Sequence, residues 1–203
     1  MSITTHAELR AAVENWLDHT LFTARVPEFI ALFEATANRR LRVRQQEAST
    51  ALTPSSGAVA LPGDYLARRR VTWTGSPRVE LQYVHPSYLQ AAYPSSPSDV
   101  PRIFTIEGST LKVRPVDGTA LEFDYFQKIP ALSPGADSGT NWLLAAHPDL
   151  YLFGALVEAE MFGVNDERAP LWKGRRDEIF DEVERLSNRT RGAGAIRVMG
   201  VTP

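Results

Sequence analysis

Residues Thr140 to Leu186, TNWLLAAHPDLYLFGALVEAEMFGVNDERAPLWKGRRDEIFDEVERL, decide the fold class of this chain. Around the helical wheel of residues 148–164, apolar side chains point in almost every direction, interrupted mainly by Glu158 and Glu160. A helix that is apolar all round belongs at the centre of a packed structure. The segment after it, with Asn165 and Asp166 as candidate caps, predicts a sharply amphipathic helix. Its narrow apolar stripe consists of Trp172, Ile179, Val183 and Leu186.

The composition indicates a soluble globular protein with one good core or two small ones. The chain has 203 residues, 43% of them hydrophobic, and its apolar runs are too short to cross a bilayer. The net charge of -2 and the pI near 6.1 argue against general nucleic-acid binding. Cysteine is absent, which excludes disulfides and thiolate metal sites. Because the N-terminus lacks the pattern of a signal peptide, we expect a protein of the cytosol.

Two helices are predicted before residue 45. Thr5 and Glu8 have the spacing of a capping box, and the apolar residues after them recur on one helical face. Pro27 suits the first turn of a second helix, which is expected to run to about Val43. The two helices are expected to form a short hairpin.

The block from Ser49 to Lys128 has a strand-like pattern instead. Runs rich in β-branched and aromatic residues are separated by Pro, Gly, Ser and Asp turns, at residues 58–62, 68–75, 78–84, 102–108, 110–116 and 120–128. In the last run Leu121, Phe123 and Tyr125 alternate with other side chains, which predicts a sheet with one half-solvated face. A single helical turn is expected at residues 86–93.

Together these patterns predict an α+β fold. We expect a bundle of about four helices, made of the N-terminal hairpin and two C-terminal helices, with an inserted small antiparallel β domain. The expected divisions are residues 1–47 for the hairpin, 48–139 for the β insertion and 140–188 for the C-terminal helices. Residues 189–203 contain Arg and Gly but no acid, and are expected to form a flexible basic arm.

The sequence contains no recognisable catalytic or metal-binding motif. His6, His19, His85 and His147 lack metal-ligand spacing, so they are interpreted as surface or capping residues. There is no nucleophile elbow, no cysteine and no glycine-rich phosphate loop. We therefore expect neither an enzyme nor a site for a metal or a cofactor.

Two groups of arginines invite a functional interpretation. Arg40 and Arg44 fall close to the apolar stripe of the second helix and therefore need an acidic partner or an interface. Arg68, Arg69 and Arg70 begin a predicted strand, where at most two of them share a face. Two interpretations stay open for this triplet: a solvated edge that resists aggregation, or a positive collar around a channel in a ring of subunits.

The order of the segments resembles the adaptor proteins of phage head-to-tail connectors, over about residues 3 to 190. The resemblance is carried, in this order, by HAELRAAVENWL, ARVPEFIALFEATANRRLRVR, VALPGDYLARRRVTW, PRIFTIEGSTLKVRP, TNWLLAAHPDLYLFGALVEA and ERAPLWKGRRDEIF. The overall plan is similar to that of the tail tubular protein A class of short-tailed phages and of related tailed-phage or gene-transfer-agent adaptors.

This resemblance implies a structural virion protein of the connector, or neck, assembled in the host cytoplasm. Twelve subunits would form a ring under the portal protein and extend the channel through which DNA is ejected. The ring would offer an attachment platform to tail, nozzle or stopper proteins. The resemblance implies contact with DNA only inside the channel, and no membrane association.

The last helix and the arm supply most of the candidate contacts. Trp172 and Phe180 are possible anchors at an interface, with packing inside the chain as the alternative for both and the favoured interpretation for Trp172. The arm is expected to dock on the portal or on an adjacent subunit and to become ordered there. The candidate portal or subunit contacts are Arg40, Arg44, Trp172, Phe180, Arg189, Arg191 and Arg197, and the candidate channel-facing residues are Arg68, Arg69 and Arg70.

A carbohydrate- or peptide-binding module is the alternative function. Trp73, Tyr83, Tyr88, Tyr93 and Tyr125 could supply an aromatic platform on the β domain. The helical frame takes more than half of the chain, which argues against a stand-alone binding module.

Overall fold

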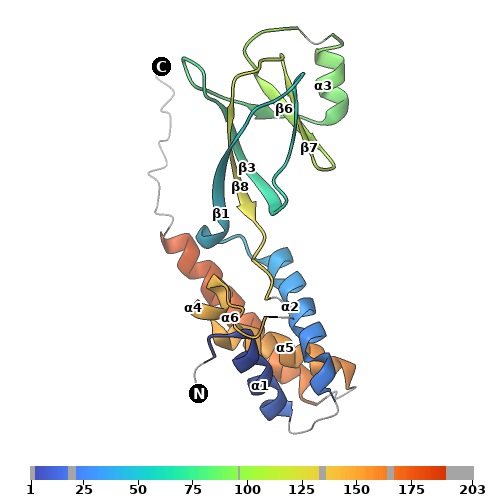
Figure 1. Cartoon of the computed structure of the whole chain (residues 1–203), viewed down its shortest axis with the longest axis vertical. Coiled ribbons are helices and arrows are strands. Elements are labelled where there is room, and N and C mark those ends of the chain that lie inside the picture. The colour runs from blue at the N-terminus through green and yellow to red at the C-terminus, as the bar shows by residue number, and fades with distance from the viewer. Residues whose placement is uncertain (1–2, 18–21, 96, 133–135, 164–166, 191–203) are drawn as a thin grey trace, which may run out of the picture. The chain divides into compact units, whose positions relative to one another are not determined.

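The chain folds into helices and two small sheets, which confirms the predicted α+β class (Figure 1). The computed structural model describes residues 3–17, 22–95, 97–132, 136–163 and 167–190. The chain divides into two compact units. The helical unit comprises Met1–Gln45 and Ile129–Pro203, and the β unit comprises Gln46–Lys128.

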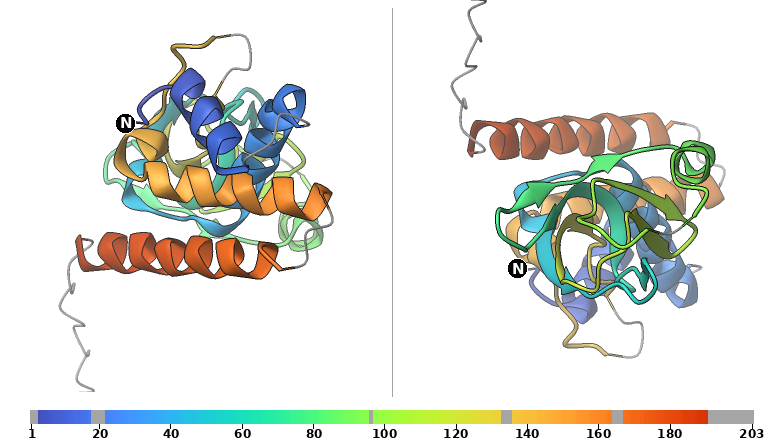
Figure 2. Two further views of the ribbon diagram at one scale, coloured as in Figure 1. Left: turned by 90° about the horizontal axis from the view of Figure 1, so that it is seen from below. Right: turned by 90° about the horizontal axis from the view of Figure 1, so that it is seen from above.

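The helical unit is built from five α-helices in its described part. They are α1 (His6–Leu17), α2 (Val26–Arg40), α4 (Trp142–Ala146), α5 (Pro148–Phe162) and α6 (Ala169–Thr190). Short 3-10 turns occupy Thr23–Arg25 and Arg44–Gln46. The left view of Figure 2 shows α5 and α6 side by side, and α5 also packs against α1 and α2. The all-apolar helix is therefore the central one, as its pattern predicts.

The helix ends follow local chemistry, with two departures from the sequence-based expectation. At α1 the capping box is present: the carboxylate of Glu8 accepts from the N–H of Thr5, and the Thr5 hydroxyl accepts from the N–H of Glu8. The second helix ends at Arg40 rather than near Val43, because Leu41 is already extended with ψ 135°. Residues 142–146 form the separate helix α4, since His147 leaves helical geometry before Pro148. The proposed caps Asn165 and Asp166 lie outside the described residues.

The core of the helical unit brings α2 and α5 very close together. Phe33 is fully buried, and its ring lies directly against Gly154 of α5. A Cβ atom at position 154 would stand 2.0 Å from that ring. The same ring packs edge-on against Tyr151, with 5.0 Å between the centroids. Glycine at 154 is therefore required by close packing rather than by backbone conformation.

A buried polar network ties the chain around residue 132 to α2 and α5. The Glu34 carboxylate, whose residue is 7% exposed, accepts from the N–H of Leu132 at 2.8 Å and from the Tyr151 hydroxyl at 3.1 Å. The Asn141 amide donates to the Tyr151 oxygen at 2.7 Å, while its carbonyl caps α4 at Leu144. Burial raises the pKa of Glu34, although the two bonds it accepts oppose the shift. Burial and the nearby carboxylate also raise the pKa of Tyr151.

The β unit contains two four-stranded sheets. The first has the strand order β1 (Glu47–Leu52), β8 (Leu121–Gln127), β3 (Tyr65–Trp73) and β4 (Val79–Glu80). The second has the order β2 (Ala58–Ala60), β7 (Thr110–Arg114), β6 (Ile103–Glu107) and β5 (Gln82–Tyr83). The short helix α3 (Pro86–Ala92) stands where a helical turn was predicted.

The expected antiparallel β domain needs three corrections. The strand pairs are antiparallel except β5 with β6, which run parallel. The single run predicted at 78–84 is divided between the two sheets, as β4 and β5. Strand β1 is missing from the sequence-based expectation because EASTAL carries few large apolar side chains; its pairing with β8 specifies it instead.

The core of the β unit comes from both sheets. On β8, Leu121, Phe123 and Tyr125 are buried while the residues between them are half-buried, as the alternation predicts. Phe104, Leu111 and Val113 of the second sheet belong to the same apolar cluster. The β unit therefore has a core of its own.

Candidate functional site

Arg40 lies at the centre of an ion-pair cluster within the helical unit. Its guanidinium contacts the carboxylates of Asp177 at 3.0 Å, of Asp181, and of Glu184 at 3.6 Å. These acids lie at positions i, i+4 and i+7 of α6, which share one helical face. The Arg40 guanidinium also covers the ring of Phe180, 4.6 Å from its centroid. Arg40 therefore has its acidic partners within its own chain, where it joins α2 to α6.

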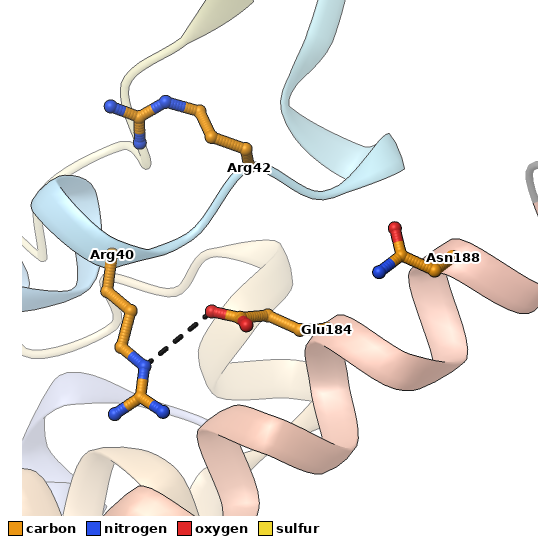
Figure 3. A pocket seen from close by; sticks show the side chains of 4 residues that line it. All are labelled: Arg40, Arg42, Glu184 and Asn188. Atoms are coloured by element: carbon orange, nitrogen blue, oxygen red, sulfur yellow. Dashed lines mark ion pairs between the residues drawn. The ribbon is translucent and has the colours of Figure 1, made fainter.

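A small cavity opens beside this cluster. It measures about 260 Å³ and is lined by Arg40, Arg42, Glu184 and Asn188 (Figure 3). Figure 3 shows Arg40 directed toward Glu184 and Arg42 directed away from it. The backbone N–H of Arg44 donates to the Ser187 hydroxyl at 3.0 Å, while the Arg44 residue is exposed. Of the two arginines predicted on the second helix, Arg44 thus presents its side chain to solvent.

Phe180 and Trp172, the candidate anchors on α6, occupy different environments. Phe180 is fully buried and packs beside Phe33, with 6.1 Å between ring centroids. A ring without exposed area has no surface to offer a partner. Trp172 is partly buried and contacts Trp16 and Phe153, with ring centroids 5.4 and 5.7 Å away.

The first candidate contact surface, called the Trp16 surface, consists of Trp16, Phe153 and Trp172. Trp16 is 46% exposed and also meets Phe153 edge-on, with 5.8 Å between centroids. Among the described residues, the buried indole N–H of Trp172 has no hydrogen-bond acceptor. Half-exposed tryptophans of this kind are typical of protein interfaces.

A second candidate surface, called the Phe162 surface, consists of Phe22, Met161 and Phe162 with Arg25. Met161 is 65% exposed and Phe162 is 48% exposed. The ring of Phe162 packs edge-on against Phe22 at 5.3 Å, and the guanidinium of Arg25 lies 5.0 Å from its centroid. Apolar side chains are therefore exposed to solvent at the C-terminal end of α5.

A groove of about 580 Å³ runs between α5 and α6. Its floor contains Phe153 and Ile179, so it adjoins the Trp16 surface. Its charged rim consists of the acids Asp149, Glu178 and Glu182 and the bases Arg175 and Arg185. A smaller cavity lined by Glu182, Arg185, Leu186 and Arg189 continues toward the end of α6. We call the first of these cavities the α5–α6 groove.

The arginine triplet on β3 is largely paired within the β unit. Arg69 contacts Glu47 at 2.7 Å and Arg70 contacts Asp124 at 2.7 Å. Arg68 covers the ring of Tyr83, 3.9 Å from its centroid, beside a cavity of about 520 Å³. Two of the three charges are thus locally compensated, although all three residues are exposed.

The aromatic platform of the alternative function is not formed. Trp73 is 8% exposed and Tyr125 is 5% exposed, and both donate to carboxylates, Asp117 and Asp64 respectively. Tyr83 and Tyr88 are exposed and Tyr93 is half-buried. With two of its five members in the core, the set offers no continuous sugar-binding face.

The histidines have unlike surroundings. His85 caps α3, accepting from the N–H of Ser87. His6 is fully buried, whereas a surface or capping position was expected. Burial and the nearby charge of Arg10 lower the pKa of His6, and the charge of Asp137 opposes that shift. His19 lies outside the described residues. Within the described ranges, no cluster of acids and histidines could hold a metal ion, and no helix could span a membrane.

The described surface thus offers exposed apolar areas and a groove, which are suited to contacts with other proteins. The family model of the SU10 adaptor protein matches residues 4–199, and the chain belongs to that family. This confirms the resemblance to phage head-to-tail adaptors and places the chain in a structural family, not an enzyme family. A search of curated proteins found no match.

Sequence reasoning missed the acidic face of α6 and the α5–α6 groove. The spacing of Asp177, Asp181 and Glu184 was a readable signal for an arginine partner on another helix. The groove had no such signal, because it depends on how two helices pack. Arg191 and Arg197 lie outside the described residues, and Arg189 lies at the end of α6.

Proposed function

We propose that this chain is a head-to-tail adaptor that forms a ring of twelve beneath the portal protein. The ring extends the DNA channel and carries the tail, nozzle or stopper proteins in the neck of the virion. Assembly takes place in the host cytoplasm, and DNA meets the ring only on its passage through the channel. Membership in the SU10 adaptor family is the observation that carries this proposal.

The two apolar surfaces of the helical unit support assembly into a ring. A closed ring uses a head-to-tail contact, in which one surface of a subunit meets a different surface of its neighbour. Phe153 and Phe162 are nine residues apart on α5, which places them about 180° apart around the helix. The Trp16 and Phe162 surfaces therefore face different directions, as a head-to-tail contact requires.

The remaining predicted contacts receive more specific roles. The helices pack as a bundle of about four at the ring interface, with Trp172 as part of the Trp16 surface. Arg44 and Arg189 are exposed at positions suited to the portal, and Arg191 and Arg197 reach the portal or a neighbour as parts of the arm. Arg40 and Phe180 act within the subunit, by holding α6 in place.

The β unit faces the channel or the tail proteins in this proposal. Arg68 is the strongest candidate to meet DNA, because Arg69 and Arg70 already pair with carboxylates. A single exposed arginine repeated around a ring still gives a positive collar. The binding-module alternative loses support because its aromatic platform is incomplete.

The experiment that tests the ring contact mixes two surface variants with the portal protein of the same phage. Trp16→Ser removes one surface and Phe162→Ser the other, and Tyr88→Ser on the β unit is the matched control. Sedimentation velocity then measures the assemblies. We expect complete rings on the portal for the wild type and for Tyr88→Ser, and none for either surface variant alone.

A mixture of the Trp16→Ser and Phe162→Ser variants tests whether the two surfaces contact each other. Each variant keeps one intact surface, so a mixture is expected to form pairs of subunits but no closed ring. Circular dichroism of each variant checks that the fold is retained. Full rings from either variant alone would contradict the assigned surfaces, and failure of the wild type to bind portal would contradict the adaptor function.

A further inference from the structure

The α5–α6 groove combines partly buried apolar side chains with more carboxylates than guanidiniums. Its floor is apolar, with Phe153 and Ile179, and its rim holds three carboxylates against two guanidiniums. Arg175 pairs with Glu178 at 3.2 Å. In the part of the chain that the structure describes, Asp149 and Glu182 make no ion pair. Arg185 makes no ion pair there either and donates to the backbone carbonyl of Asp181 at 3.1 Å, so the rim has an excess of one carboxylate. An apolar trough with this charge fits a segment that is both apolar and basic.

The chain itself contains such a segment beyond the last described residue. Residues 191–203, RGAGAIRVMGVTP, carry two arginines and no acid. Residues 195–201 read AIRVMGV, in which Ile196 and Val198 flank Arg197. Side chains of an extended segment alternate in direction, so Ile196 and Val198 can enter a trough while Arg197 meets its rim.

The length of residues 195–201 also agrees with the length of the groove. The groove follows α6 from Arg175 to Arg185, ten residue steps that span about 15 Å at the helical rise. Seven residues in extended conformation span up to about 23 Å, enough to occupy the whole groove. Gly192 and Gly194 precede this segment and place few restrictions on its direction of approach.

We propose that residues 195–201 of one subunit bind the α5–α6 groove of the adjacent subunit. This inference rests on the proposed function, since it needs neighbouring subunits in a ring. Ile196 and Val198 cover Phe153 and Ile179, while Arg197 pairs with Glu182. Each subunit thereby gives one segment and receives one, a head-to-tail contact that continues the ring interface.

Disulfide cross-linking tests the proposal cleanly, because the natural chain has no cysteine. One full-length protein carries Ile179→Cys, which keeps Glu182 as the partner of Arg197, and a second, of larger mass because of a tag, carries Val198→Cys. The two are mixed on the portal protein and oxidised, and ring formation is checked by negative-stain microscopy. A non-reducing gel then separates the mixed dimer from dimers of either protein alone.

We expect the mixed dimer to form in high yield, and Arg197→Glu in the Val198→Cys protein to lower that yield severalfold. Arg39→Cys replaces Ile179→Cys as the control, since Arg39 is exposed on α2 and outside the groove. Rings that give no mixed dimer, or as much with Arg39→Cys, would overturn the groove assignment and leave the adaptor function standing. If Ile179→Cys and Val198→Cys in one chain link only within that chain, the exchange between neighbours is wrong. Absence of rings would overturn both proposals.

Discussion

The guanidinium of Arg40 covers the ring of Phe180, with 4.6 Å between its central carbon and the ring centroid. This one contact links the C-terminal end of α2 to the middle of α6. The carboxylates of Asp177, Asp181 and Glu184 surround the same guanidinium. The surface helix α6, which is long and mostly charged, is thereby held at a defined position by a cation and a buried ring.

Arg40→Ala is therefore expected to lower the free energy of unfolding by about 1–2 kcal/mol. A single exposed ion pair contributes less than about 1 kcal/mol, but this cation has several partners and an aromatic face. Urea unfolding measures the loss, which should shrink in 1 M salt because exposed charges are screened. Arg39→Ala is the control, since Arg39 bonds Thr36 on its own helix. Equal stability of the two variants would contradict the assigned role.

Two glycines of the helical unit are expected to respond oppositely to alanine. Gly154→Ala places a methyl group against the Phe33 ring and should destabilise the fold by about 1–3 kcal/mol. At Gly174 of α6 nothing lies within 4 Å of an added Cβ, so Gly174→Ala should stabilise the fold by about 0.5–1 kcal/mol. Thermal unfolding of both variants checks the pair. A neutral Gly154→Ala would mean that α2 and α5 do not approach as closely as described.

Glu34 predicts a pH dependence of stability. Its pKa is raised in the folded chain, so as pH rises from about 4.5 the unfolded chain loses this proton before the folded chain does. The contribution of Glu34 to stability is therefore favourable at low pH and declines as pH rises through the folded pKa. Glu34→Gln keeps an oxygen that can accept from Leu132 and Tyr151 but does not titrate.

Urea unfolding of the wild type and Glu34→Gln between pH 4 and pH 8 measures this effect. Relative to the wild type, the variant should gain stability as the pH rises. Glu28→Gln, an exposed position on the same helix, serves as the control. A difference that is constant with pH, or that changes in the opposite direction, would show that the folded chain does not raise this pKa.

Local chemistry explains which elements were predictable from the sequence. The Thr5 and Glu8 capping box and the alternation on β8 involve neighbours in the chain, so their residues carry the full signal. Strand β1 depends on β8, more than sixty positions away, and its small residues contain little strand signal. The α+β class and the family resemblance follow from such local patterns and their order.

The functional surfaces were less predictable for the same reason. Phe180 suggested an anchor because it lies on an amphipathic helix, but only packing shows that its ring faces Phe33. Arg40 was expected to need a partner, and the partner could be identified only once α2 and α6 were placed together. The α5–α6 groove arises from two helices at once and has no sequence motif of its own.

Negative-stain microscopy of the purified chain mixed with the portal protein of the same phage tests the central claim most directly. A ring of this protein stacked coaxially on the portal is the expected result. Portal particles without an added ring, across a range of salt concentrations and with the chain fully folded, would contradict the adaptor function.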